Sequence, residues 1–206
     1  MRHAIALAAL ISLSGASFAD TITDYTLDPT HAQVRFSWSH LGFSTPGANF
    51  DQVTGTVRVN EEHPERSTVS VRIPVDSVNT HVPLLDEHLL TQPGFFDAKA
   101  HPDITFESTG IRNVDRDQQR FDLVGTLTVN GIQKEVVLAT QVNKVGPHPM
   151  WDNAPAIGLD ARTTVKRSDF KMDAYAPAVS DEMPIQITIE AVEAKAFAEQ
   201  MAKMAK

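Results

Sequence analysis

The chain has 206 residues, no cysteine and a formal net charge of −8 at pH 7. The absence of cysteine excludes disulfides, cysteine nucleophiles and cysteine-based zinc sites. An anionic chain is a poor partner for nucleic acid or anionic membranes. The length is sufficient for one domain with a sizeable core.

Residues 1–19 have the pattern of a secretory signal peptide. Arg2 gives a basic start, residues 4–13 are an apolar run, and Ser17 and Ala19 are small residues at the −3 and −1 positions of a cleavage site. The run is too short to span a bilayer. We therefore expect one exported domain at residues 20–206, without stable membrane insertion. An N-terminal strand or anchor is the alternative.

Beyond residue 20, apolar residues mostly alternate with polar ones, which is typical of half-buried antiparallel strands. The alternation predicts about eight strands, at residues 34–38, 53–59, 68–75, 103–111, 121–129, 135–142, 157–167 and 185–190. Asn130-Gly131 predicts a tight hairpin. The prolines within residues 146–155 predict a loop.

The segment at residues 80–97 has a helical period instead. Pro83 suits a first helical turn, and Leu85 and Leu89 lie four residues apart, as on one face of a helix. The aromatic pair Phe95-Phe96 follows. A short helix and a bulky aromatic pair, inserted into a β protein, predict a lid over a hollow interior.

The predicted fold is all-β: a single antiparallel eight-stranded barrel with a short helix inserted mid-chain. Such a barrel is either filled by its own side chains or wide enough for one ligand. A sandwich of eight or nine strands is the competing architecture. The tail at residues 192–206 predicts either a short terminal helix or a solvated end.

The patterns of common catalytic and metal sites are missing from the sequence. It contains no Gly-x-Ser-x-Gly elbow, no His-Glu-x-x-His motif and no glycine-rich phosphate loop. Asp86, Glu87 and His88 are the densest potential metal ligands, but adjacent helical residues point to different faces. We therefore expect no enzymatic activity, no cofactor and no metal.

Seven short motifs stand in order along the chain. They are YTLDPTH at 25–31, F-x-x-x-H-L-G at 36–42, VDSVNT at 75–80, DEHL and FFD within 86–97, HPDITFEST at 101–109, GTLTVNG at 125–131 and RSDF at 167–170. In this order they resemble the YceI-like family of bacterial periplasmic proteins, over nearly all of residues 20–206.

The resemblance implies a lipocalin-like barrel with a long apolar cavity. It also implies non-enzymatic binding, with carriage or storage, of a long apolar chain in the periplasm. A polyprenyl chain or the tail of a quinone is the expected ligand. Three residues depart from the family's pattern: Ala32 replaces Ser, Leu85 replaces Arg and Lys171 replaces Gly.

We expect the ligand to contact an apolar wall and an apolar lid. The predicted ligand-binding residues are Phe36, Trp38, Ile73, Leu85, Leu89, Phe95, Phe96, Phe106, Leu127 and Phe170. The predicted head-group contacts are His31, His40, Arg167 and Lys171, with internal hydrogen bonds or surface ion pairs as the alternative. A stress-related interaction protein with a filled core and an enzyme acting on a quinone or lipid are the rival functions. A homodimer is left open.

Overall fold

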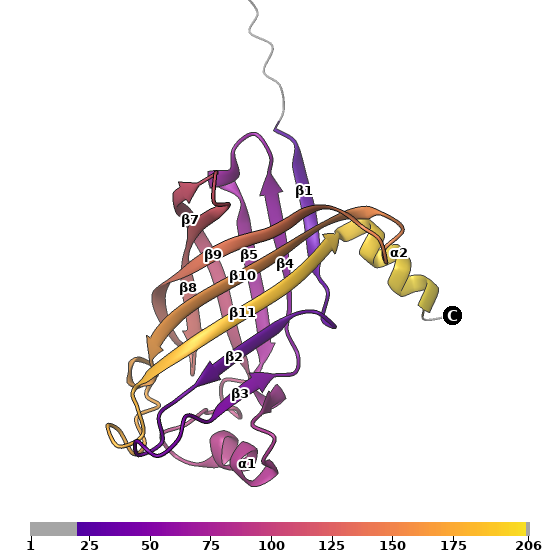
Figure 1. Ribbon diagram of the computed structural model, residues 1–206. Helices are drawn as coiled ribbons and strands as arrows, with labels where there is room; N and C mark the ends of the chain where they lie inside the picture. Colours follow the sequence, from indigo (N-terminus) through magenta and orange to yellow (C-terminus); the bar gives the residue numbers. More distant parts are fainter. Residues whose placement is uncertain (1–19, 205–206) are drawn as a thin grey trace, which may run out of the picture.

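The computed structural model describes residues 20–204 (Figure 1). The predicted signal peptide at residues 1–19 lies outside these residues. The strands are β1 (Ile22–Leu27), β2 (Gln33–Ser37), β3 (Gly47–Phe50), β4 (Thr54–Asn60), β5 (Thr68–Pro74), β6 (Val78–Asn79), β7 (Asp103–Asp115), β8 (Arg120–Val129), β9 (Ile132–His148), β10 (Ala154–Lys166) and β11 (Glu182–Glu193). The helices are α1 (Pro83–Thr91) and α2 (Ala194–Met204), with short 3₁₀ turns η1 (Pro64–Arg66), η2 (Val75–Ser77) and η3 (Arg167–Phe170).

The predicted eight-stranded antiparallel barrel is confirmed. Its strands follow the order β1, β4, β5, β7, β8, β9, β10 and β11, and β1 pairs with β11 to close the ring. The closing pairs include Tyr25 with Glu193 and Leu27 with Ala191. A sandwich has no such closure, so the competing architecture is excluded.

Strand β11 pairs with β10 along one edge and with two different strands along the other edge. Its last residues pair with β1, whereas Ile185 to Thr188 pair with β2. Strands β3 and β6 continue from β2, so these three strands extend the sheet beyond the closed ring. The predicted strand at 34–38 therefore exists as β2 but is not one of the eight in the ring.

Strand β1 was not among the predicted strands, although it completes the ring. Its sequence, ITDYTL, buries only Tyr25 and Leu27, and Ile22 is exposed. The apolar alternation is therefore too weak to mark it, and its place depends on partners far along the chain. This is long-range pairing overriding a weak local pattern.

The hairpin predicted at Asn130-Gly131 is confirmed. Both residues have positive φ, at 51° and 71°, and Val129 pairs with Ile132 across the turn. This matches a two-residue hairpin, whose backbone twist requires positive φ at both positions.

The loop predicted at residues 146–155 is wrong in its extent. Strand β9 runs on to His148 and β10 begins at Ala154. Pro147 and Pro155 lie opposite each other at the end of this hairpin. A missing backbone donor is tolerated at such a sheet margin, so proline did not end the strands.

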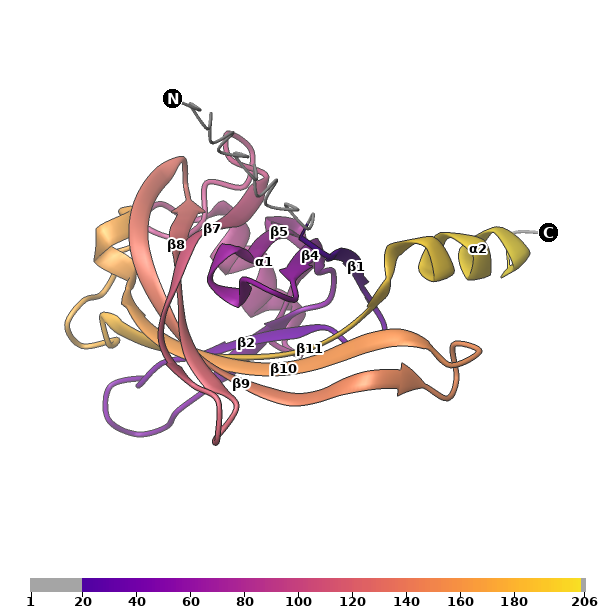
Figure 2. The ribbon, with the colours of Figure 1, turned by 90° about the horizontal axis from the view of Figure 1, so that it is seen from above.

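The predicted helix in the middle of the chain forms, and of the two alternatives for the tail the helix is the one observed; the two helices lie at different parts of the barrel (Figure 2). Helix α1 begins at Pro83 as predicted and buries Leu89. The Asp86 carboxylate accepts hydrogen bonds from the Thr80 backbone N–H at 2.7 Å and hydroxyl at 2.6 Å, which ties α1 to the end of β6. Helix α2 buries no residue, and its Phe197 stacks on Trp151 in the β9–β10 hairpin.

Candidate ligand-binding cavity

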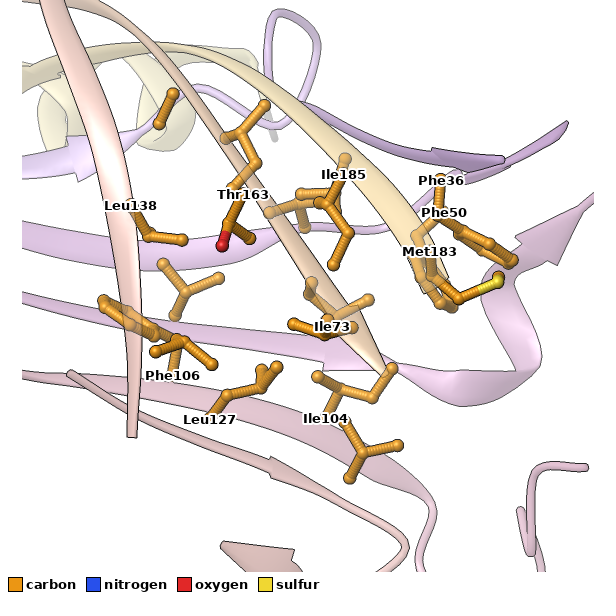
Figure 3. Close-up of a pocket in the computed structure, with 18 of the residues that line it drawn as sticks. Phe36, Phe50, Ile73, Ile104, Phe106, Leu127, Leu138, Thr163, Met183 and Ile185 are labelled. Atoms are coloured by element: carbon orange, nitrogen blue, oxygen red, sulfur yellow. The ribbon is translucent and has the colours of Figure 1, made fainter. Parts of the chain in front are cut away.

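The interior of the barrel contains a cavity of about 170 Å³, which we call the inner cavity (Figure 3). Among the described residues, every lining side chain is apolar except Thr140, Thr163 and Arg167. Within residues 20–204, no carboxylate and no histidine lines it. The wall can therefore bury apolar surface but offers no pair of acid and base groups.

The inner cavity follows directly from the alternation of the strands, because successive residues of a strand point to opposite faces. Strand β5 contributes Val69, Val71 and Ile73, and β11 contributes Ile185 and Ile187. The intervening residues of these strands face outward. A glycine on β8 also shapes the wall.

That glycine is Gly125, which leaves room for the ring of Phe106. A Cβ atom at Gly125 would lie only 2.4 Å from the Phe106 ring. Any side chain at this position would therefore push Phe106 out of its place in the wall. The missing side chain thus fixes where a large aromatic residue of the inner cavity can lie.

A second pocket of about 280 Å³, which we call the outer pocket, lies under α1. Its lining includes Trp38 and His40 after β2, Leu85 and Leu89 on α1, and Phe95. The β10–β11 connection contributes Tyr175 and Val179. Helix α1 and the aromatic pair after it therefore cover this end of the barrel, as the predicted lid would.

The inner cavity and the outer pocket share five lining residues, which we call the neck: Phe36, Phe96, Arg167, Met172 and Met183. The Phe36 and Phe96 rings meet edge to face at 6.5 Å, and Phe50 packs against both, at 5.4 and 6.1 Å. The neck thus consists of two aromatic rings, two methionines and one cation.

All ten predicted ligand-binding residues line one of the two spaces. The inner cavity is lined by Phe36, Ile73, Phe96, Phe106, Leu127 and Phe170, and the outer pocket by Phe36, Trp38, Leu85, Leu89, Phe95 and Phe96. Their contact with a ligand stays a prediction. Four further lining residues were not among the predicted ones: Phe50, Met172, Tyr175 and Met183.

Arg167 is a buried cation at the neck, with a side chain almost free of solvent contact. Its guanidinium donates to the backbone carbonyls of Ser180, Met172 and Val179, from Nε, Nη1 and Nη2 at 2.8, 2.6 and 2.9 Å. Burial lowers the pKa of Arg167, against the charges of Asp181 and Asp173.

These carbonyls use three of the five N–H donors of the guanidinium. Internal hydrogen bonding, the alternative for this residue, is therefore present. Two donors of Arg167 remain for another acceptor. Within residues 20–204 no carboxylate forms an ion pair with Arg167.

The other predicted head-group residues lie at different places. His40 lines the outer pocket. His31 lines neither space, and its Nδ1 lies 2.9 Å from the Asp28 carboxylate. Lys171 is exposed and also lines neither space. The structure therefore brings Arg167 and His40 to the cavity system and leaves His31 and Lys171 outside it.

The Asp28–His31 pair predicts a pH dependence of stability. The hydrogen bond with Asp28 raises the pKa of His31, against the opposing effect of burial. Burial acts to raise the pKa of Asp28, but hydrogen bonds from Thr30 and His31 outweigh it and lower that pKa. The pair therefore stabilises the fold most between the unfolded pKa values of Asp and His, about 3.9 and about 6.5.

When the pH rises above the raised pKa of His31, the imidazole loses its proton and the pair no longer stabilises the fold. When the pH falls below the window, Asp28 takes up a proton and the stabilisation is lost as well. We expect wild type to lose stability relative to His31→Gln as pH rises from about 6 to about 8. Urea unfolding of both proteins across this range is the measurement. Parallel pH profiles would show that the pair does not act in this way.

Lys171 predicts a stabilising substitution, because it adopts a left-handed backbone with φ of 58° and ψ of 30°. This conformation is costly for residues with a Cβ and free of that cost for glycine. Lys171→Gly should raise the free energy of unfolding by about 1 kcal/mol, or the melting temperature by about 2–4 °C. Lys166→Gly, where φ is −92°, should instead lower both. Equal effects at the two positions would contradict this account.

Within residues 20–204 no cluster of three or more His, Cys, Asp or Glu side chains is arranged to hold a metal ion. No helix in the same residues has both the length and the apolar character needed to cross a membrane.

An eight-stranded antiparallel barrel with an apolar interior and a helical lid defines a lipocalin-like binding barrel. The chain belongs to the YceI-like domain family, whose model matches residues 25–191. A UPF0312 protein of Azotobacter vinelandii is 32% identical over 191 residues, covering 92% of this chain and 95% of that protein. Protein YceI of Escherichia coli O157:H7 is 31% identical over 193 residues, covering 93% and 96%. Membership of the YceI-like domain family supports a role in binding.

Solved structures agree with this assignment. The YceI protein of Campylobacter jejuni is 30% identical, with a TM-score of 0.66 over 75% of this chain and 89% of that one. A polyisoprenoid binding domain from Saccharophagus degradans has a TM-score of 0.61 over 82% and 98%. Its identity of 14% makes it a likeness of fold alone.

Proposed function

We propose that the protein binds an isoprenoid-type ligand, such as a polyprenyl chain or the tail of a quinone, and carries or stores it in the periplasm. The apolar wall of the inner cavity is the observation that supports this most. Burying one methylene group contributes about 0.8 kcal/mol, so the four hydrogen-bearing carbons of one five-carbon unit contribute about 3 kcal/mol before ordering costs. A few such units are sufficient for micromolar binding, at about −8 kcal/mol.

The sizes of the two spaces imply how a tail would lie. Pockets for drug-sized ligands usually measure about 300–1,000 Å³, whereas the inner cavity has about 170 Å³ and the outer pocket about 280 Å³. A tail too long for one space would occupy both and pass the neck, whereas a shorter tail would fill the inner cavity and leave its head group at the neck. Met172 and Met183 suit this, because methionine is unbranched and changes rotamer readily.

The chemistry of the wall favours binding over catalysis. An enzyme acting on a quinone or lipid needs acid, base or nucleophilic groups beside its substrate. Among the described residues that line the inner cavity, Arg167 carries the ionisable side chain, and it stays protonated. His40 and His88 line the outer pocket instead, away from the apolar wall of the inner cavity. The guanidinium donors left free at the neck suit the oxygen atoms of a head group such as a phosphate or a quinone.

The name of the Saccharophagus degradans domain and the signal-peptide pattern of residues 1–19 support the ligand class and the periplasmic location. The test is to purify the exported protein without denaturing it, extract it with organic solvent and analyse the extract by mass spectrometry. We expect an isoprenoid-type molecule in amounts comparable with the protein. An extract without any apolar small molecule would count strongly against the proposal.

A further inference from the structure

Exposed apolar side chains gather at the end of the barrel that carries α1. Phe43, at 90% exposed, and Leu41, at 53%, lie on the β2–β3 loop. Leu84, at 77%, and Val82, at 51%, lie at the start of α1, and Tyr175, at 67%, lies in the β10–β11 connection. Figure 1 shows α1 and both loops at the same, lower end of the barrel. We call these five residues the apolar rim.

Each part of the apolar rim adjoins the outer pocket. Tyr175 lines the pocket itself, Leu41 follows the lining residue His40, and Leu84 precedes the lining residue Leu85. Because Tyr175 is also largely exposed, the outer pocket reaches the surface within the rim. The outer pocket therefore lies between the rim and the neck, and the neck borders the inner cavity.

The rim segments carry no formal charge. Residues 38–46, 81–85 and 174–180 contain no Asp, Glu, Lys or Arg, although such residues make up 21% of the chain. The Leu41 backbone N–H donates to the Ala178 carbonyl at 3.0 Å, which joins the two loops. An uncharged apolar surface on an anionic protein suits a partner that takes up apolar side chains without needing opposite charge.

We propose that the apolar rim docks on the surface of a lipid bilayer and that the ligand passes between bilayer and cavity through the docked opening. The proposal rests on the proposed function, since an isoprenoid tail dissolves in a bilayer and not in water. A second copy of the chain fits less well, because two opposed rims would close both openings. A bilayer also accepts side chains from separate loops, as in interfacial insertion of aromatic and aliphatic residues.

The test is cosedimentation with vesicles of phosphatidylcholine, which carries no net charge. The rim variant is Phe43→Ser with Leu84→Ser. The matched control is Val145→Ser with Met150→Ser, which removes side chains exposed at 66% and 80% from the distant β9–β10 hairpin. The rim variant should bind vesicles at least about tenfold more weakly, and the control should bind as wild type does. Added salt should leave binding unchanged, because docking is apolar.

Farnesol, a short isoprenoid alcohol, separates docking from ligand binding. The rim variant should keep the farnesol affinity of wild type without vesicles, yet take farnesol from vesicles more slowly. Rim-dependent vesicle binding by a protein that takes up no farnesol would support docking and contradict the proposed function. Failure of wild type to bind vesicles would overturn docking, as would equal losses in both double variants. A rim variant that loses only self-association would also overturn it, in favour of a second copy.

Discussion

Tryptophan in place of Leu127 is expected to lower the affinity for farnesol by about a hundredfold, the effect of losing room for one five-carbon unit. Leu127 lies in the wall of the inner cavity, beside Phe106 and Ile73 (Figure 3). A larger apolar side chain at this position fills the space that a ligand would occupy. Because it fills empty space, it should leave the fold intact. Because the chain already contains Trp38 and Trp151 and the variants add a third tryptophan, the affinity is measured by displacement of a fluorescent isoprenoid analogue with farnesol.

The matched control is Thr126→Trp on the same strand. Thr126 does not line the inner cavity, and it adjoins Leu127 in sequence, so it faces the other side of β8. It should bind farnesol as wild type does. Phe106→Asp is a second blocking variant, because a carboxylate in this wall has no partner and repels an apolar tail. Unchanged affinity in Leu127→Trp would remove the inner cavity from the binding site.

Methionine in place of Arg167 is expected to lower the free energy of unfolding by about 3 kcal/mol. The substitution leaves the carbonyls of Ser180, Met172 and Val179 without their donor. Each buried acceptor left unsatisfied costs about 1–3 kcal/mol, and removal of a buried cation offsets part of that loss. Urea unfolding monitored by circular dichroism is the measurement.

Lys166→Met is the matched control, since Lys166 is the exposed neighbour of Arg167. It should change the free energy of unfolding by less than about 0.5 kcal/mol. A stability of Arg167→Met equal to that of Lys166→Met would show that the three carbonyl contacts do not hold the β10–β11 connection. The same variant tests the head-group prediction. If Arg167 contacts a phosphate, its loss should weaken farnesyl phosphate binding more than farnesol binding.

Local patterns were sufficient to predict most of the barrel. Alternating residues along β5, β8 and β11 mark both the strand and the side chains that face inward, because the two share one period. The Asn130-Gly131 hairpin was predicted for the same reason, since its backbone requirement lies within two residues. The closure by β1 was not predicted, because its partner β11 lies at the other end of the chain and its own alternation is weak.

The lining residues of the candidate site were likewise predictable where a strand period marks them and not predictable elsewhere. Phe106 and Leu127 follow from the strand period, and Met183 could have been found by extending the period of β11 back by two residues from Ile185. Met172 and Tyr175 lie in an irregular connection, where no period indicates which side chain turns inward. The partners of Arg167 are backbone carbonyls of that connection. Every residue has a backbone carbonyl, so the sequence does not indicate which ones accept these hydrogen bonds.

The seam between β1 and β11 has a consequence for how the molecule comes to exist. Leu27 pairs with Ala191, and both Ala191 and Val192 are fully buried there. The seam joins residues from the two ends of the described chain, so it can form only after the last strand has been made and the strands between β4 and β10 have paired. We therefore expect the ring to stay open until nearly the whole polypeptide has been synthesised. A nascent chain in this state lacks the closed barrel and can still pass through an export channel.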